Sequence, residues 1–184
     1  QAIDRDADTF TVSIDPGYPL PTLDYFGSSE SKLQARRFYL MDADSGDFIR
    51  DIPPFDIDQI EQDGEAYILS SRRQILSHWK GERFVMMARR SKHAFRLIDT
   101  GGMVFDRVTV HSAPAQAFNE MTGPGGNQYL NCDVRLLGDR LMTVNADAFF
   151  SKRMRQGPIL QKCYFEKMDD DGGNIGSTNL RVLS

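Results

Sequence analysis

Four acidic residues in two turns are the side chains of this 184-residue chain whose types and spacing could do chemistry. Asp147 lies in a turn of small residues, and Asp169, Asp170 and Asp171 follow a short apolar strand in a second turn. Asp147 lies 23 positions before Asp170 and 24 before Asp171. If this spacing is one turn of a coiled β structure, carboxylates distant in sequence become neighbours in space.

Crowded carboxylates repel one another, which favours the protonation of one beside another that stays ionised. Cleavage of a glycosidic bond requires such a pair. The acid protonates the departing oxygen, and the carboxylate either activates water, which inverts the anomeric centre, or attacks directly, which retains it. A solvated turn is the alternative interpretation of Asp169–Asp171 alone. The position of Asp147 one coil earlier favours the catalytic interpretation.

Three segments in the second half of the chain can be laid over one another: FDRVTV (105–110), YLNCDV (129–134) and LQKCYF (160–165). Their first residues are 24 and 31 positions apart, and apolar residues occupy the first, fourth and last columns. Each copy is predicted to be one short strand followed by polar or glycine turns. This pattern favours a parallel β-helix over leucine-rich or helical repeats. FVMMA (84–88) and AFRLID (94–99) are expected to be strands of an earlier coil.

The longer of the two coils contains seven extra residues. If these lie in LLGDR (136–140), Asp147 and Asp171 occupy the same column of neighbouring coils. Val108, Cys132 and Cys163 then form an inward column. Free thiols packed as small hydrophobes are favoured there over a disulfide.

The first part of the chain differs in texture and has short strands separated by turns. Residues 1–80 are expected to form a small β-barrel or sandwich-like module, with strands at Thr9–Ile14, Ala35–Met41, Asp47–Ile52 and Glu65–Ser71. A loop at 19–31 and a break at Pro53–Pro54 separate these strands. The DADSG turn (42–46) is similar to part of a calcium loop, but it lacks the downstream carboxylate of an EF-hand, and a solvated turn is favoured. Residues 81–184 are expected to form the coils, which gives an all-β chain built on a right-handed parallel β-helix.

Several polar side chains near the acidic turns are candidates for binding substrate. Arg153 and Arg155 lie between the turns and could bind sugar hydroxyls or keep an Asp ionised, or be solvated only. Asn145 precedes Asp147 in its turn, and Asn174 could bind substrate or cap a turn. The other candidates are weaker: His111 and Asn127 in earlier coils, and His78–Trp79 as a sugar-stacking platform or a core element.

Composition limits the classes of partner. The net charge of −4 gives no reason to expect nucleic acid or an anionic membrane, and no apolar run approaches the roughly 20 residues of a membrane span. Two cysteines are too few for a disulfide scaffold and lack the spacing of a metal site. We expect no cofactor and no metal. Because the chain starts at Gln1 and stops soon after the third matched segment, we interpret it as an internal piece of a longer solenoid.

The acidic turns and the strand between them also carry a family-like pattern, NAD...GP.(I/L)..C.FE.M.DD..NI. The matching residues are Asn145, Ala146, Asp147, Gly157, Pro158, Ile159, Cys163, Phe165, Glu166, Met168, Asp170, Asp171, Asn174 and Ile175. This pattern resembles the β-helical α-galactosidases of glycoside hydrolase family 110, most strongly over about residues 100–176. That family carries a small barrel inserted into its β-helix, which agrees with the module expected in the first part.

The resemblance implies an inverting, secreted or periplasmic enzyme that removes terminal α-1,3-linked galactose from an oligosaccharide or glycan. It implies Asp170 as general acid, with Asp147 and Asp171 positioning or activating water. It implies no nucleic-acid or membrane partner and allows a homo-oligomer.

One departure and two alternatives accompany this resemblance. Ala148, Phe149 and Phe150 stand where related β-helix enzymes have Gly and a polar residue, which puts the substrate preference in doubt. Polygalacturonases also combine an Asn-x-Asp turn with an Asp-Asp pair, and they form the first alternative. A non-catalytic β-helix, such as an adhesin or a tailspike module with a surface or calcium-binding acidic cluster, is the second.

Overall fold

The computed structural model describes residues 8–18, 37–49, 55–57, 59–71, 83–86 and 92–177. These residues form sixteen β-strands and no helix, so the described part of the chain is all-β. The predicted loop at 19–31, the break at Pro53–Pro54 and the His78–Trp79 candidate lie outside the described residues. No helix long and apolar enough to cross a membrane occurs in the part of the chain that is described.

The chain divides into two compact units, Gln1–Arg89 and Arg90–Ser184. The division lies nine residues beyond the boundary predicted after residue 80. The first unit contains two antiparallel three-stranded sheets, ordered β1-β5-β4 and β3-β2-β6. Their strands are β1 (Asp8–Val12), β2 (Arg37–Met41), β3 (Phe55–Asp56), β4 (Gln59–Asp63), β5 (Ala66–Ser71) and β6 (Arg83–Met86).

The two sheets of the first unit share one apolar core. Phe38 of β2 and Leu69 of β5 are buried in it, with Phe10 of β1 and Phe84 of β6 packed against them. Phe10 and Phe84 stack with ring centroids 5.4 Å apart. The prediction that FVMMA (84–88) belongs to the coils is therefore wrong, because β6 pairs antiparallel with β2.

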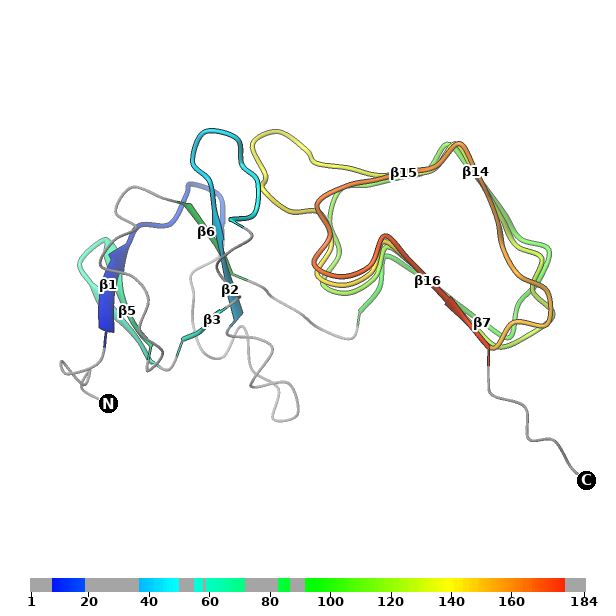
Figure 1. The fold of residues 1–184 in the computed structure, drawn as a ribbon, viewed down its shortest axis with the longest axis horizontal. Helices are drawn as coiled ribbons and strands as arrows, with labels where there is room; N and C mark the ends of the chain where they lie inside the picture. Colours follow the sequence, from blue (N-terminus) through cyan, green and yellow to red (C-terminus); the bar gives the residue numbers. More distant parts are fainter. Residues whose placement is uncertain are drawn as a thin grey trace, which may run out of the picture. The chain divides into compact units, whose positions relative to one another are not determined.

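The second unit consists of three parallel sheets through which the chain passes repeatedly (Figure 1). The first, ordered β16-β13-β10-β7, has four strands, and the others, β14-β11-β8 and β15-β12-β9, have three each. The strands of the four-stranded sheet are β7 (Phe95–Ile98), β10 (Phe118–Met121), β13 (Phe149–Lys152) and β16 (Gly173–Gly176). The others are β8 (Val104–Asp106), β9 (Thr109–Val110), β11 (Gln128–Leu130), β12 (Asp133–Val134), β14 (Ile159–Gln161) and β15 (Tyr164–Phe165).

The register of these sheets confirms the predicted columns. Tyr129 pairs with Phe105 on one side and with Leu160 on the other, which is the alignment of the three six-residue segments. Each segment nevertheless forms two short strands, where one was predicted. A residue with positive φ separates the two strands of each segment: Arg107 (55°), Asn131 (54°) and Lys162 (55°). The backbone turns a corner at these residues, so each segment contributes to two sheets.

The extra residues of the longer coil lie where they were predicted. Val110 pairs with Val134, and Ala113 forms a parallel bridge with Val144. Three positions in the earlier coil therefore correspond to ten positions in the later one. The chain thus takes seven additional residues between Val134 and Val144, around Gly138. The cysteines of the inward column are both free, as was favoured.

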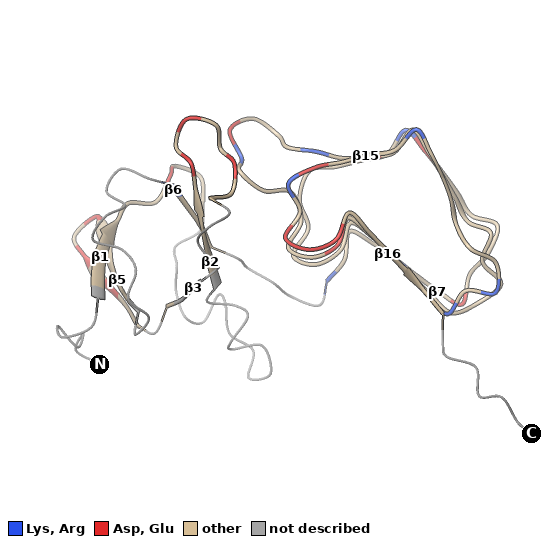
Figure 2. Cartoon of the chain, viewed as in Figure 1, with Lys and Arg blue, Asp and Glu red and all other residues tan. Residues whose placement is uncertain are grey.

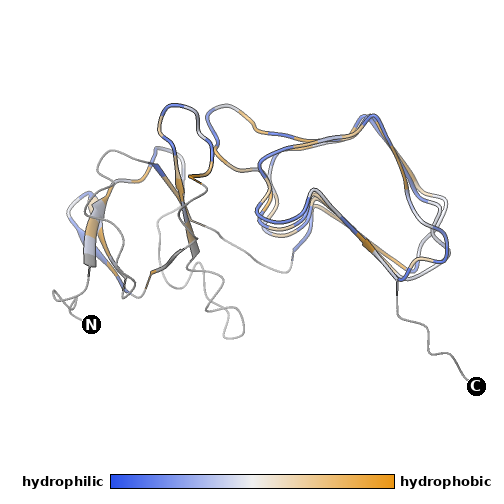
Figure 3. Cartoon of the chain, viewed as in Figure 1, coloured by the Kyte–Doolittle hydropathy of each residue, from blue (hydrophilic) through white to orange (hydrophobic). Residues whose placement is uncertain are grey.

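Aromatic side chains stacked from coil to coil fill the interior of the second unit. Phe95 and Phe118 stack at 5.4 Å and 10°, and Phe105 and Tyr129 at 5.1 Å and 3°. Tyr129 also meets Phe149 edge-on at 4.8 Å. Figure 3 shows hydrophobic and hydrophilic segments alternating along each coil. The stacked interior side chains fix the register of each sheet. The residues just before its strands are therefore held in register as well.

Candidate functional site

Three carboxylates from two consecutive coils meet at the entrance to the four-stranded sheet. One oxygen each from Asp147, Asp170 and Asp171 lies within 4.8 Å of the other two. Asp147 is 4% exposed, whereas Asp170 and Asp171 are exposed. In Figure 2 an acidic stretch is visible just ahead of β16, beside an inward bend of the stacked coils. The structure therefore brings together three of the four acidic residues in the two turns, the three to which the family resemblance gives catalytic roles.

Strand register explains how residues so far apart in sequence meet. Phe149 of β13 pairs with Gly173 of β16, so Asp147 and Asp171, each two residues earlier, occupy the same column. The backbone N–H of Ala148 donates to the carbonyl of Asp171 at 3.0 Å, which continues the ladder into this turn. The prediction that Asp147 and Asp171 are column neighbours is confirmed. Asp169 is fixed otherwise, since its N–H donates to the carbonyl of Val144 at 3.1 Å.

The same column extends to two residues that the sequence reasoning missed, His93 and Gln116. Each lies two positions before its strand, as Asp147 does, because Phe95 pairs with Phe118 and Phe118 with Phe149. Matching backbone bonds link the coils here: Ala94 N–H donates to the Gln116 carbonyl at 3.1 Å, and Ala117 N–H to the Asp147 carbonyl at 3.3 Å. The column therefore reads His93, Gln116, Asp147, Asp171.

A signal for this column exists in the sequence. His-Ala-Phe (93–95), Gln-Ala-Phe (116–118) and Asp-Ala-Phe (147–149) are three copies of one tripeptide pattern. Ala148 and Phe149 are fully buried in the core, as are Ala117 and Phe118. The Ala-Phe pair was interpreted as a departure that puts the substrate preference in doubt. It is a core element of the two middle coils, whereas Ala94 is exposed and the last described coil has Gly172–Gly173 at these positions. Of the three residues in the departure, only Phe150 is partly exposed and remains relevant to the substrate.

Gln116 holds the buried carboxylate in place. Its Nε2 donates to Oδ2 of Asp147 at 3.1 Å across one coil. Burial, followed by the positive charge of Arg96, lowers the pKa of His93 below its ordinary value, and the Gln116 side chain opposes that shift. His93 is therefore neutral near pH 7, so its ring offers one hydrogen-bond donor and one acceptor.

Among the described residues, no lysine or arginine forms an ion pair with Asp147 or Asp171. Carboxylates at this separation repel one another, and a bound cation would relieve that repulsion. Asp147, Asp170 and Asp171 are accordingly the residues that could hold a metal ion. They are also the residues that could divide the roles of acid and base.

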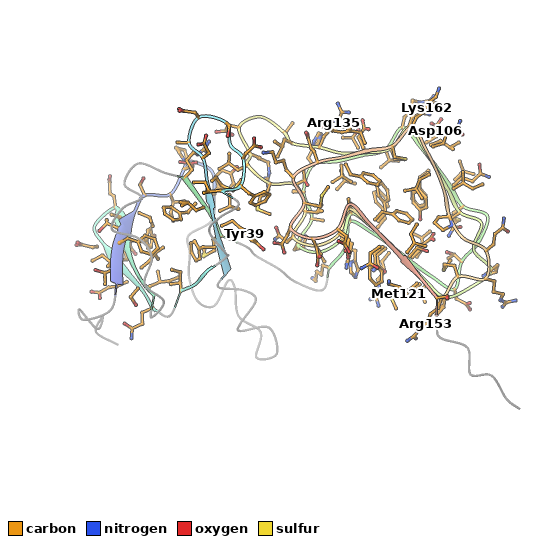
Figure 4. All side chains as sticks on the ribbon, viewed as in Figure 1. Tyr39, Asp106, Met121, Arg135, Arg153 and Lys162 are labelled. Carbon is orange, nitrogen blue, oxygen red and sulfur yellow. The ribbon has the colours of Figure 1, made fainter. Side chains whose placement is uncertain are left out.

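The two predicted arginines lie elsewhere. Arg153 is at the corner that follows β13 (Figure 4), with φ of 60° and its N–H donating to the carbonyl of Gly176. Asp147 precedes the same strand, and four residues of strand are about 13 Å long. Arg155 lies further along that corner, where its N–H donates to the Gly123 carbonyl. Because β13 separates these arginines from the acidic turn, the geometry speaks against their keeping Asp147 ionised, and their binding of sugar hydroxyls stays a prediction.

The two predicted asparagines lie on either side of the acidic cluster along the chain. Asn145 is two residues before Asp147, and its N–H donates to the Ala113 carbonyl at 3.0 Å. Asn174 is paired in register with Phe150, and its Oδ1 accepts a hydrogen bond from Lys152 Nζ. Lys152 Nζ also lies 5.2 Å from the centre of the Phe150 ring. Asn174 is thus part of a polar and aromatic patch that consists of Phe150, Lys152 and Asn174. Asn174 lies three residues after Asp171, as Phe150 lies three residues after Asp147.

A second carboxylate is buried inside the coils and has a different environment. Glu120 is fully buried and accepts from Asn127 Nδ2 at 2.8 Å, Tyr129 OH at 3.0 Å and Ser151 Oγ at 2.6 Å. Asn127, which was considered for the site, is therefore an interior residue. His111, the other weak candidate, has Nδ1 3.0 Å from the Arg135 carbonyl on the β9-β12-β15 wall. Neither belongs to the acidic cluster.

No family model matches the chain, and no curated protein matches it.

Proposed function

We propose that this chain is a glycoside hydrolase that resembles family 110 and removes terminal α-1,3-linked galactose with inversion. The observation that carries the proposal is the meeting of the Asp147, Asp170 and Asp171 oxygens within 4.8 Å. The coils are proposed to form a right-handed parallel β-helix, since connections between parallel strands are right-handed in about 98% of cases. A secreted or periplasmic location and a glycan partner belong to the same proposal.

In the proposed reaction Asp170, which is exposed, donates its proton to the departing glycosidic oxygen. Asp147 and Asp171, which are column neighbours, hold the water that attacks the anomeric carbon from the opposite face. A water that donates to two carboxylates at about 2.7 Å each fits between oxygens no more than 4.8 Å apart. One of the two carboxylates takes the water's proton, and Gln116 keeps Asp147 oriented for this role.

The carboxylate separation does not decide the stereochemical part of the proposal. Inverting enzymes usually separate their two carboxyl groups by about 6.5–9.5 Å, and retaining enzymes by about 5–5.5 Å. The nearest oxygens here are closer than either range. Inversion therefore rests on the family resemblance and on the fit of a water between Asp147 and Asp171, and product analysis tests it separately.

The assay compares wild type with Asp170→Asn on α-1,3-galactobiose. We expect wild type to release galactose and the variant to lose about 10²–10⁴-fold in kcat, the usual contribution of a general acid. On a dinitrophenyl α-galactoside, whose leaving group needs no proton, the variant should recover most of that loss. The matched control is Asp169→Asn. Asp169 is next to Asp170 in sequence, but its carboxylate is not one of the three that meet. Equal turnover of galactobiose by wild type and Asp170→Asn rules out the acid assignment.

The same cluster favours one other function, a non-catalytic module that binds calcium. Calcium accepts six to eight oxygen ligands at about 2.3–2.6 Å, and three carboxylate oxygens within 4.8 Å of one another could supply part of that shell. This reading predicts that calcium raises the Tm of wild type and leaves that of Asp147→Asn unchanged. It is preferred if calcium has this effect and no galactoside is hydrolysed. Release of galacturonic acid from polygalacturonate would instead favour the polygalacturonase-like alternative.

A further inference from the structure

The two upstream members of the acidic column, His93 and Gln116, have chemistry that the hydrolytic roles do not use. Strands of a parallel sheet lie about 4.8 Å apart, so Gln116 is about one spacing and His93 about two spacings from Asp147. Both side chains are partly exposed. The column therefore continues away from the carboxylates as a row of neutral polar groups.

The hydrogen-bonding capacity of these two side chains exceeds what the fold consumes. In the described part of the chain, Nδ1 of His93 and Oε1 of Gln116 are buried and outside hydrogen-bond geometry, although Gln116 is near enough to raise the pKa of His93 as a hydrogen-bond partner does. The carboxamide of Gln116 has two N–H groups and a carbonyl, of which Nε2 is bonded to Asp147. Buried polar atoms without partners are uncommon in folded proteins. At the edge of a proposed active site, they indicate groups that a ligand completes.

We propose that His93 and Gln116 bind the hydroxyl groups of the terminal sugar, with Gln116 touching both the sugar and Asp147. This inference rests on the proposed function. The proposed acid, Asp170, lies on the last coil, so the departing sugar lies on that side. The terminal ring then lies on the side of Asp147, toward Gln116 and His93.

The chemistry of the column selects a neutral pyranose. A sugar hydroxyl is both donor and acceptor, as are a carboxamide and a neutral imidazole. An acidic sugar would require a cation beside its carboxylate, and the column itself contains none. The cation whose charge acts on His93 is Arg96, which lies three residues later in β7 and is exposed. The expected ligand is therefore galactose or a similar neutral hexose, with a uronic acid as the contrasting case.

The test measures binding apart from catalysis. Galactose is titrated into the Asp170→Asn protein, and affinity is measured by calorimetry with and without His93→Ala. One lost hydrogen bond to a sugar corresponds to about a tenfold weaker Kd, and His93→Gln, which keeps a donor and an acceptor, should recover most of it. His111→Ala is the matched control, since His111 lies on another wall, and should change Kd less than twofold.

A second readout does not depend on any substitution being tolerated. The chain has three histidines, and galactose should move the imidazole NMR signal of His93 but not that of His111. Equal galactose affinity with and without His93→Ala, or an unmoved His93 signal under saturating galactose, overturns the inference even if galactobiose is hydrolysed. Tighter binding of galacturonate than of galactose overturns the neutral-sugar assignment. If galactose binds through His93 but no galactoside is cleaved, the inference stands and the hydrolytic proposal fails.

Discussion

Two Asp-rich turns of this chain are similar in sequence and different in structure. In the first unit, Asp42 opens the turn between β2 and Phe48, and its Oδ1 accepts from the N–H groups of Asp44 at 3.1 Å and Ser45 at 2.7 Å. In the second unit, Asp147 is buried and its side-chain partner, Gln116, is 31 residues away. The Asp42 carboxylate, which is partly exposed, is hydrogen-bonded within its own turn. The buried carboxylate of Asp147 is instead positioned by strand register.

This difference separates a carboxylate that shapes a turn from carboxylates that could react. The bonds from the Ser45 and Asp44 backbone stabilise the ionised form and hold the pKa of Asp42 below its ordinary value. Asp147, Asp170 and Asp171 come from two coils, and one oxygen of each lies within 4.8 Å of the other two. An Asp-rich motif is therefore informative about chemistry only when the fold brings a second acidic segment to it.

The largest expected effect contrasts these two turns directly. Asp147→Asn should lower galactobiose turnover by about 10²–10⁴-fold, because the water loses one of its two carboxylate partners. Asp42→Asn should leave turnover within about twofold, the level expected for a surface substitution remote from the site. Steady-state kinetics on folded, monodisperse protein measures both. Similar losses of turnover in Asp147→Asn and Asp42→Asn would contradict the distinction between the two turns.

A stability effect distinguishes the interior carboxylate from both turns. Glu120→Ala leaves the donors of Asn127, Tyr129 and Ser151 without their acceptor inside the coils. We expect a loss of about 3–5 kcal/mol in the free energy of unfolding, since each orphaned buried donor costs about 1–3 kcal/mol. Glu120→Gln retains an acceptor and should lose about half as much. Urea denaturation measures both variants, and a loss below about 1 kcal/mol for Glu120→Ala would contradict the network.

The smallest expected effects concern pH. Folding lowers the pKa of His93 below 6.5, through burial and then Arg96, and that of Asp42 below 3.8, through hydrogen bonds from Ser45. In both cases the unfolded state binds more protons, so the contribution to stability is complete above the unfolded pKa and is lost as pH falls through the folded one. Wild type should therefore lose more stability than His93→Gln as pH falls below about 6.5, and more than Asp42→Asn only below about 3.8. Urea midpoints measured across both windows test this, and parallel pH profiles would contradict it.

The repeat columns of the second unit could be predicted because similar residue patterns recur along the sequence. Phe105, Tyr129 and Leu160 fill one column of the interior, so their apolar character recurs at the coil spacing. The seven-residue insertion could be placed between Val134 and Val144 because LLGDR was the polar, glycine-containing interruption available. These two inferences were sufficient to make Asp147 and Asp171 neighbours.

Other features depended on contacts that no local pattern reveals. β6 has the apolar character of a coil strand, but its pairing with β2 is set by tertiary contacts. Arg107 and its equivalents adopt a positive φ without being glycine, so the corner within each segment had no composition signal. Arg153 lies between the acidic turns in sequence, but β13 carries the chain away from Asp147 before Arg153 is reached. His93 and Gln116 were missed because the Ala-Phe repeat was treated as an anomaly of one turn.

The configuration of the first sugar released tests the central claim most directly. Proton NMR should follow the anomeric signals of galactose during early hydrolysis of α-1,3-galactobiose by wild type, before mutarotation mixes the anomers. If Asp170 protonates the departing oxygen while Asp147 and Asp171 hold the attacking water, β-galactose appears first. First appearance of α-galactose would contradict the account, because it would require one of these carboxylates to attack the sugar itself.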